Sequence, residues 1–194
     1  MRIYRFSLLF AACFLQAALV FSQGKIEKEK SIKKSEVPEA ALEWLDDAFE
    51  EIKKPKWYQE FFENGYSYEA KFRFQEHFYS VEFDSLGRIE DVEVEIQLSE
   101  LASEIRETIE AYWDTNYEKY KVLKVQIQYS GEEDDLEDFF DEDSMEGVRI
   151  AYEIEYHGKE ISGADEIWEA TFDSAGVFIS KRKIIIRISD NLTF

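Results

Sequence analysis

The sequence predicts an α+β protein made of two tandem α-β4 repeats, in each of which a helix packs on an antiparallel sheet. A turn of the form Phe-Asp-Ser-x-Gly occurs twice, at 83–87 and at 172–176. Each copy lies between segments that alternate apolar and polar residues, and each alternating set follows a segment with helical periodicity. We therefore expect a first repeat over residues 36–97 and a second over residues 98–194.

The two turns are the most specific structural signals in the chain. Asp84 and Asp173 occupy the first position of a type I turn, where the side chain accepts hydrogen bonds from backbone amides two residues on. Gly87 and Gly176 occupy the fourth position, where a positive φ lets the next strand fold back. We expect these four residues to have a structural role.

The first 22 residues have the features of a secretory signal peptide. Arg2 and Arg5 precede an apolar run over 6–20, and Val20-Phe21-Ser22 offers a cleavage site before Gln23. This run is shorter than the ~20 residues that a membrane span requires. A periplasmic or extracellular location without membrane insertion is therefore expected.

Two further features belong to this terminal region. Cys13 permits the alternative of a lipoprotein, although the apolar run continues past it, where a lipoprotein would turn polar. Residues 23–35 are polar and rich in lysine, without an apolar period, and we expect them to form a flexible tether.

Two segments have helical periodicity. In the first, apolar residues recur three and four positions apart from Val37 to Ile52, and Pro55 would end the helix. In the second, Ser99 is a plausible N-cap for a helix that ends near Asn116.

Strand-like alternation of apolar and polar residues fills most of the remaining chain. The expected strands cover 56–63, 68–74, 79–83, 89–96, 125–129, 148–156, 167–172 and 177–188. Their apolar sides are expected to face the helices. The expected wet side carries Glu69, Lys71, Arg73, Glu93, Glu95, Arg149, Glu153 and Glu155. Cross-strand charge pairs, worth ~0.2–1 kcal/mol each, are one explanation of this side; a charged recognition surface is the other.

The net charge restricts the partners. The chain has 43 acidic and 23 basic residues, a formal net charge of −20. Such a balance argues against binding to nucleic acid or to an anionic membrane surface, both of which need clustered positive charge. It favours a protein partner with a basic surface and is compatible with weak binding of divalent cations.

An acidic insertion, 131–146, interrupts the second repeat. Ten of its sixteen residues are acidic, so self-repulsion predicts an extended, solvated loop. Phe139 and Phe140, flanked by Asp138 and Asp141, suggest the alternative of an arm that is steered to a basic partner and anchored there by its rings. The spacing of an EF-hand calcium loop is missing.

No catalytic, cofactor or metal site is predicted. The two histidines, His77 and His157, fall near turns in corresponding parts of the repeats, and they lack the spacing of a zinc site. There is no nucleophile elbow. A hydrolase whose catalytic residues are distant in sequence remains an alternative.

Val37-Pro38 at the start of a helix, the strand Tyr68–Phe72, the turn Phe83–Gly87 and the second copy of this pattern resemble the PepSY-like, β-lactamase-inhibitor-like family of secreted bacterial proteins. The resemblance covers residues 37–188. It implies a two-layer tandem fold without catalysis, and a binding protein that inhibits an extracytoplasmic enzyme of the peptidase or β-lactamase class. No inhibitory motif is present to transfer, and the inhibitor's disulfides are absent. An acidic envelope scaffold or a cation-binding protein is the alternative.

Overall fold

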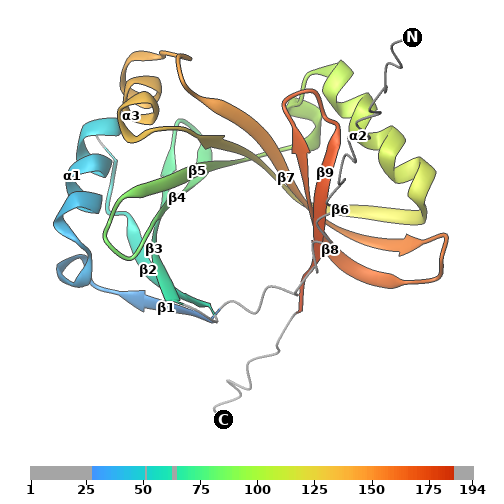
Figure 1. Ribbon diagram of the computed structural model, residues 1–194, viewed down its shortest axis with the longest axis horizontal. Coiled ribbons are helices and arrows are strands. Elements are labelled where there is room, and N and C mark those ends of the chain that lie inside the picture. Colours follow the sequence, from blue (N-terminus) through green and yellow to red (C-terminus); the bar gives the residue numbers. More distant parts are fainter. Residues whose placement is uncertain (1–27, 51, 63–64, 186–194) are drawn as a thin grey trace, which may run out of the picture.

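The computed structural model describes residues 28–50, 52–62 and 65–185 (Figure 1). The expected signal peptide, its cysteine and the chain beyond residue 185 lie outside these residues. The strands are β1 (Lys28–Ile32), β2 (Lys56–Phe62), β3 (Gly65–Phe74), β4 (His77–Phe83), β5 (Ile89–Ile96), β6 (Tyr117–Ser130), β7 (Arg149–Glu160), β8 (Asp165–Asp173) and β9 (Phe178–Lys183). The helices are α1 (Glu39–Ala48), α2 (Ser103–Asn116) and α3 (Glu133–Glu142), with 3₁₀ turns η1 (Lys34–Glu36) and η2 (Leu98–Glu100).

The strands form one antiparallel sheet in sequence order, from β1 to β9. The α+β prediction is confirmed, but the halves do not have separate sheets. They are joined because β5 pairs with β6 from Val92 opposite Tyr129 to Ile96 opposite Val125. The sheet is strongly curved, and the three helices lie on its outer, convex side (Figure 1).

Two apolar cores lie between the helices and the convex side. In the first core, Trp44 and Leu45 of α1 pack with strand residues such as Phe83. In the second, Ile109 and Trp113 of α2 pack with strand residues that include Tyr156 and Phe172. Both cores use the inward positions that the period of two predicts.

Helix α1 ends earlier than its apolar period indicates. The helix ends at Ala48, and Phe49 is already extended, with φ −134° and ψ 100°. Phe49 is buried and contacts the rings of Phe72, Phe74 and Tyr79. Packing of this ring therefore overrides the helical period that continues to Ile52.

The prediction of a flexible tether over residues 23–35 is wrong for the described part of that segment. Residues Lys28–Ile32 form the edge strand β1, paired with β2 from Lys28 opposite Phe61 to Ile32 opposite Trp57. Lys34–Glu36 then form η1, where the Glu36 carboxylate accepts a hydrogen bond of 2.9 Å from the Lys33 amide. Backbone pairing stabilises a strand whose sequence has no apolar period.

The expectation that the acidic insertion is an extended, solvated loop is also wrong. Its residues 133–142 form α3, which packs beside α1 (Figure 1). Leu136 is fully buried in the first core, and the indole nitrogen of Trp44 donates a hydrogen bond of 3.3 Å to the carbonyl of Glu133. The acidic residues occupy the exposed side, so the helix forms despite their repulsion because its apolar stripe is buried.

Candidate functional site

The concave side of the sheet is the candidate site. The three helices of the described residues lie on the convex side, so none of them covers the concave side (Figure 1). Strand residues that alternate with the core positions are expected to face the concave side. A cavity of about 90 Å³ is lined by Glu60, Glu69, Lys71, Glu82, Glu93, Lys124, Gln126, Glu153, Glu155, Glu169 and Arg182. We call these eleven residues the acidic face, because seven of them are acidic and three are basic.

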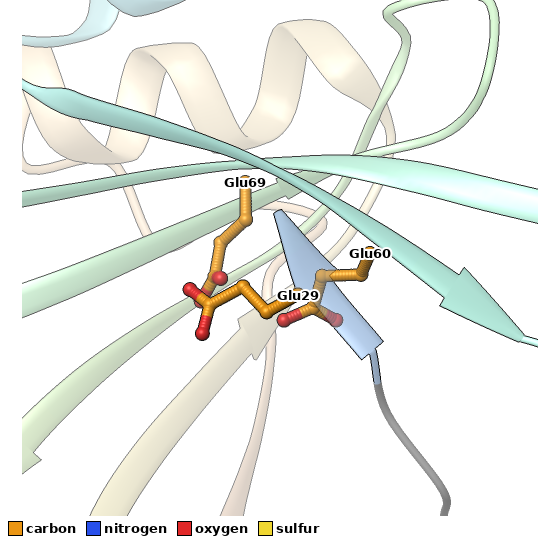
Figure 2. A group of neighbouring side chains, drawn as sticks. All are labelled: Glu29, Glu60 and Glu69. Atoms are coloured by element: carbon orange, nitrogen blue, oxygen red, sulfur yellow. The ribbon is translucent and has the colours of Figure 1, made fainter. Parts of the chain in front are cut away.

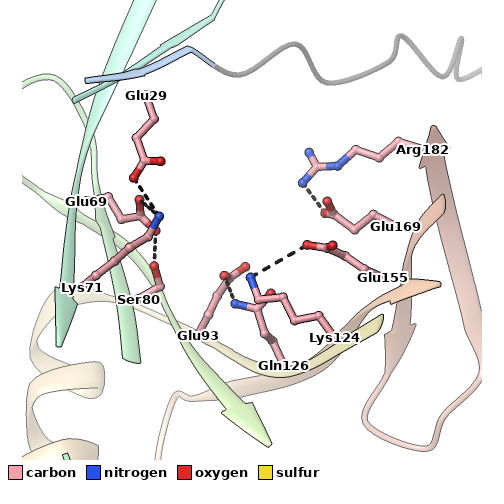
Figure 3. Close-up of polar contacts among 10 residues, drawn as sticks. All are labelled: Glu29, Glu69, Lys71, Ser80, Glu93, Lys124, Gln126, Glu155, Glu169 and Arg182. Atoms are coloured by element: carbon pink, nitrogen blue, oxygen red, sulfur yellow. Dashed lines mark hydrogen bonds and ion pairs between the residues drawn. The ribbon is translucent and has the colours of Figure 1, made fainter. Parts of the chain in front are cut away.

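An ion-pair cluster, in which Glu60 and Glu69 are buried and Glu29 is exposed, forms one wall of the acidic face. Glu29, Glu60 and Glu69 come from β1, β2 and β3 and point toward one another (Figure 2). The Lys71 ammonium lies 2.8 Å from Glu69 and 3.0 Å from Glu29, and the Ser80 hydroxyl donates to Glu69 (Figure 3). The chain itself therefore supplies a cation to Glu69 and Glu29.

Glu69 is 4% exposed, although the sequence places it on the wet side. It is buried on the concave side, where the Lys71 ammonium and the Ser80 hydroxyl contact its carboxylate. Burial by itself lowers the pKa of Lys71, but hydrogen bonds to Glu69 and Glu29 outweigh burial and hold this pKa above its ordinary value.

At the floor of the acidic face, Glu82 and Glu93 form a group of three carboxylates with Asp91 of β5. Oxygens of Glu82, Asp91 and Glu93 all lie within 4.8 Å of one another. Gln126 donates a hydrogen bond of 2.5 Å to Glu93, and Gln128 donates one of 3.0 Å to Asp91. We call Glu82, Asp91 and Glu93 the carboxylate triad.

Asp91 is the most perturbed member of the triad. Its Oδ1 atom is buried and accepts no hydrogen bond in the structure. Burial, with the negative charges of Glu82 and Glu93 next in importance, raises the pKa of Asp91 to about 9. The raised pKa favours the protonated form of Asp91, which lowers the repulsion within the triad.

The opposite wall comes from β7, β8 and β9. Arg182 pairs with Glu169, and the Lys124 ammonium lies 3.9 Å from Glu155 (Figure 3). Burial lowers the pKa of Arg182, but the hydrogen bond to Glu169 and further carboxylates outweigh it and raise the pKa overall. One of those carboxylates is Glu82 on β4, so this wall interacts with the carboxylates at the floor of the face.

This arrangement is suited to binding positive charge. Its own three cations are engaged with neighbouring carboxylates, and the carboxylates still outnumber them. Partly buried charges interact more strongly than exposed ones because less solvent screens them.

The sequence points to part of this site. Of the residues expected on the wet side, Glu93, Glu153 and Glu155 line the acidic face together with Glu69 and Lys71. Arg73 and Glu95 lie in the same cross-strand row as Phe78, and Arg149 is exposed at the start of β7.

Other residues of the site were missed by sequence reasoning. Glu82, Gln126, Glu169 and Arg182 line the acidic face, and Asp91 belongs to the triad. All but Arg182 stand an even number of positions from, or directly opposite, a residue expected on the wet side, and this alternation could have identified them.

Phe139 and Phe140, proposed from the sequence as partner-binding rings, pack against the first core. The ring centroid of Phe140 lies 4.9 Å from that of Phe49, and that of Phe139 lies 4.8 Å from that of Tyr129. Asp138 and Asp141 are exposed on the outer side of α3. None of these four residues lines the acidic face.

The turn residues have structural contacts. The Asp84 carboxylate accepts hydrogen bonds from the amides of Leu86 and Arg88, at 2.8 and 3.0 Å. Gly87 has a φ of +87°. In the second turn, the Asp173 carboxylate accepts hydrogen bonds of 2.9 Å from the amides of Ala175 and Val177, and Gly176 has a φ of +79°.

The histidines have separate surroundings. The Nε2 atom of His157 lies 2.8 Å from Oδ1 of Asp165, whereas Nε2 of His77 lies 3.8 Å from Oε1 of Glu100. Among the described residues, neither histidine belongs to a group of side chains close enough to share a metal ion.

Among the residues that the structure describes, no helix is both long and apolar enough to cross a membrane.

No protein-family model matches the sequence, and no curated protein matches it significantly.

Solved structures from Bacteroides share the fold. A DUF2874 family protein from Bacteroides ovatus is 12% identical, with a TM-score of 0.53, and the match covers 76% of this chain and 87% of that one. A proposed periplasmic protein from Bacteroides eggerthii is 11% identical, with a TM-score of 0.51 and coverage of 76% and 88%. A BLIP-like protein from Bacteroides fragilis is 12% identical, with a TM-score of 0.50 and coverage of 79% and 90%. At these identities the similarity concerns the fold.

Proposed function

We propose that this chain is an exported, non-enzymatic binding protein whose acidic face receives a basic segment of another protein. The observation that carries the proposal is the excess of carboxylates on a concave, partly buried surface formed by strands from both halves of the sheet. A lysine or arginine of a partner would complete the neutralisation that Lys71, Lys124 and Arg182 begin.

The carboxylate triad is the part of the face best suited to such a side chain. Its oxygens are within 4.8 Å of one another, and this crowding contributes to the raised pKa of Asp91. A positive charge placed there lowers the pKa of Asp91 again, so binding at neutral pH should release a proton to solvent. The site therefore favours cations over neutral ligands.

The biological form of this function that we propose is inhibition of an extracytoplasmic enzyme of the peptidase or β-lactamase class. The resemblance to secreted inhibitor-like proteins supports it, and so does the fold shared with a BLIP-like protein. The signal-peptide features of residues 1–22 support export. The shared fold with the Bacteroides eggerthii protein, which is described as periplasmic, supports a periplasmic location.

We further propose that the two halves are repeats. Each half has a helix followed by four strands, α1 with β2–β5 and α2 with β6–β9, and in the second half α3 is inserted between β6 and β7. The turn at Gly87 approaches Pro38 at the start of α1, and the turn at Gly176 approaches Ile105 in α2, which is an equivalent packing.

The test uses a synthetic, fluorescently labelled peptide of alternating lysine and threonine, with binding followed by anisotropy at low and moderate salt. The variant Glu82→Gln, Glu93→Gln, Glu153→Gln removes three charges from the concave side. The control Glu43→Gln, Glu107→Gln, Glu142→Gln removes three exposed charges from the helices. We expect the first variant to weaken binding about tenfold or more and the control by less than about twofold, because screening reduces the effect of exposed charges.

Equal loss of affinity in the two variants would show that only net charge matters and would refute the proposal. A pull-down from periplasmic extract then identifies the natural partner, and enzyme assays on that partner test inhibition.

A divalent cation is the second candidate ligand, because the triad brings three carboxylates within 4.8 Å. Calcium binding by titration calorimetry, lost in the Glu82→Gln, Glu93→Gln variant and unaffected by the lysine peptide, would favour this candidate over the first.

A further inference from the structure

The concave side changes character along β6 to β9. One cross-strand row at the acidic face consists of Lys124, Glu155, Glu169 and Arg182. The next row in the same direction consists of Lys121, His157, Ile167 and Ile184. Because side chains two residues apart on a strand share a face, the second row continues the first on β7 and β8. On β6 the register shift between Val122 and Lys124 makes the interval three residues. A charged surface therefore gives way to one that is partly apolar.

The second row belongs to a groove of about 560 Å³. Its apolar lining consists of Leu123, Ile167, Ile184 and Ile185. Leu123 lies where β6 shifts register against β7, between Val122 and Lys124. Leu123 is 47% exposed and Ile185 is 43% exposed. Single exposed apolar residues are common, but several that line one hollow indicate a contact surface.

The rim of the groove carries charges of both signs. Lys183 lies 2.6 Å from Glu166, and His157 lies 2.8 Å from Asp165. The groove itself therefore does not select strongly for charge, and its apolar lining sets what it accepts. Selection for charge comes from the neighbouring acidic face.

We propose that the groove binds one aliphatic side chain of the same basic segment that occupies the acidic face, an inference that rests on the function proposed above. The occupant is thus an extended segment in which a leucine, isoleucine or methionine lies close in sequence to lysine or arginine. Charge complementarity with the acidic face identifies this occupant, and the groove adds the apolar requirement.

The spacing of the two features follows from the strand geometry. Glu153, on the acidic face, and His157, beside the groove, are four residues apart on β7. At ~3.3 Å per residue their Cα atoms are about 13 Å apart. Because a lysine or arginine side chain spans part of this distance, the aliphatic residue should lie two to four positions from the basic one.

The experiment compares two labelled peptides of ten residues, each with alternating lysine and threonine. One has leucine three positions after its last lysine, and the other has serine there. Both are titrated against the native protein, against Leu123→Ser and Ile185→Ser, and against the control Leu86→Ser. Leu86 is 67% exposed in the β4–β5 turn, outside the groove. Thermal melts establish that each variant is folded.

We expect the leucine peptide to bind the native protein roughly tenfold more tightly than the serine peptide, the gain that burial of one aliphatic side chain provides. The groove variants should abolish this difference, and Leu86→Ser should preserve it. Equal affinity for both peptides, with binding still weakened by Glu82→Gln, Glu93→Gln and Glu153→Gln, would overturn the groove and leave the proposed function standing. Failure of both peptides to bind would overturn both.

Discussion

Leu136→Ala tests whether the acidic insertion is part of the fold. Leu136 lies in α3 and is fully buried in the first core, although ten of the sixteen residues of the insertion 131–146 are acidic. Replacing it with alanine removes a buried isobutyl group from the contact of α3 with α1 and the sheet.

The magnitude follows from burial. A buried leucine replaced by alanine loses the transfer free energy of the removed atoms and leaves a cavity, which together cost about 2–5 kcal/mol. For a domain of this size, each 1 kcal/mol changes the melting temperature by about 2–4 °C. We therefore expect the melting temperature to fall by roughly 4–20 °C. The lower end applies if α3 moves inward to fill the space.

The assay is thermal unfolding followed by circular dichroism, with urea unfolding as a second measure. Met145→Ala is the matched control, since Met145 lies in the same insertion and is 52% exposed. The control should change the free energy of unfolding by less than about 0.5 kcal/mol. If Leu136→Ala were as stable as the control, α3 would not be part of the core, and the insertion would be a loop.

Three further predictions concern the turns and the buried charges. Gly176→Val and Gly87→Val should each lower the free energy of unfolding by more than ~1 kcal/mol in thermal melts, because both glycines have a positive φ. An added Cβ would also lie 2.7 Å from the carbonyl oxygen of Ile105 at Gly176 and 2.7 Å from the Cβ of Pro38 at Gly87. Ser85→Ala and Ser174→Ala, in the same turns, should cost less. The pKa of Asp91 is raised by folding, from its ordinary value of 3.8 to about 9, so the folded protein binds one more proton between these pH values. The free energy of unfolding should therefore fall as pH rises through this range. Asp91→Asn should remove this slope in urea unfolding measured at several pH values. Lys71→Met should cost about 1–3 kcal/mol in urea unfolding, because the buried Glu69 carboxylate loses its cation; a second change, Glu69→Gln, should restore much of this loss. If the stability of the native protein did not change with pH, the raised pKa of Asp91 would be wrong. If Lys71→Met left the free energy of unfolding unchanged, Lys71 would not stabilise the Glu69 carboxylate.

The sequence is informative where burial imposes a period. Most strands and the body of α2 follow from apolar residues that recur at two or at three and four positions, and the structure places most of those residues in the two cores. The expected N-cap Ser99 is wrong, because it lies in the 3₁₀ turn η2 and α2 begins at Ser103 after Ala102. Strand β1 could not be predicted, since Lys28–Ile32 is held by backbone hydrogen bonds to β2 at the sheet edge and needs no apolar side.

Helix α3 was predictable in principle. Leu136, Phe139 and Phe140 stand at the i, i+3, i+4 spacing of a buried helical stripe, but the acidic residues between them predict solvation. Whether this segment forms a helix depends on an apolar surface against which its stripe can pack. The rings of Phe49 and Tyr129 provide that surface, and only the tertiary structure brings them there.

The candidate site was predictable only as a charged strand surface. Alternation places Glu69, Glu93 and Glu153 on one side of their strands. It does not reveal that the sheet is continuous and curved, that Glu69 is buried, or that Glu82 lies near Arg182. Pairing of β5 with β6 and curvature are properties of the whole sheet, and neither has a local sequence signal.

The most direct test of the acidic face is an amide chemical-shift titration of the ¹⁵N-labelled protein with the lysine-threonine-leucine peptide. The account predicts that the largest shifts fall on the strands that carry Glu82, Glu93, Gln126 and Glu153, whereas the amides of α1 and α2 change little. Helix α3 is the sharpest internal control, because it is strongly acidic but lies on the convex side. Shifts concentrated on α3, or distributed over all acidic surfaces alike, would contradict the claim that the concave side is the binding site.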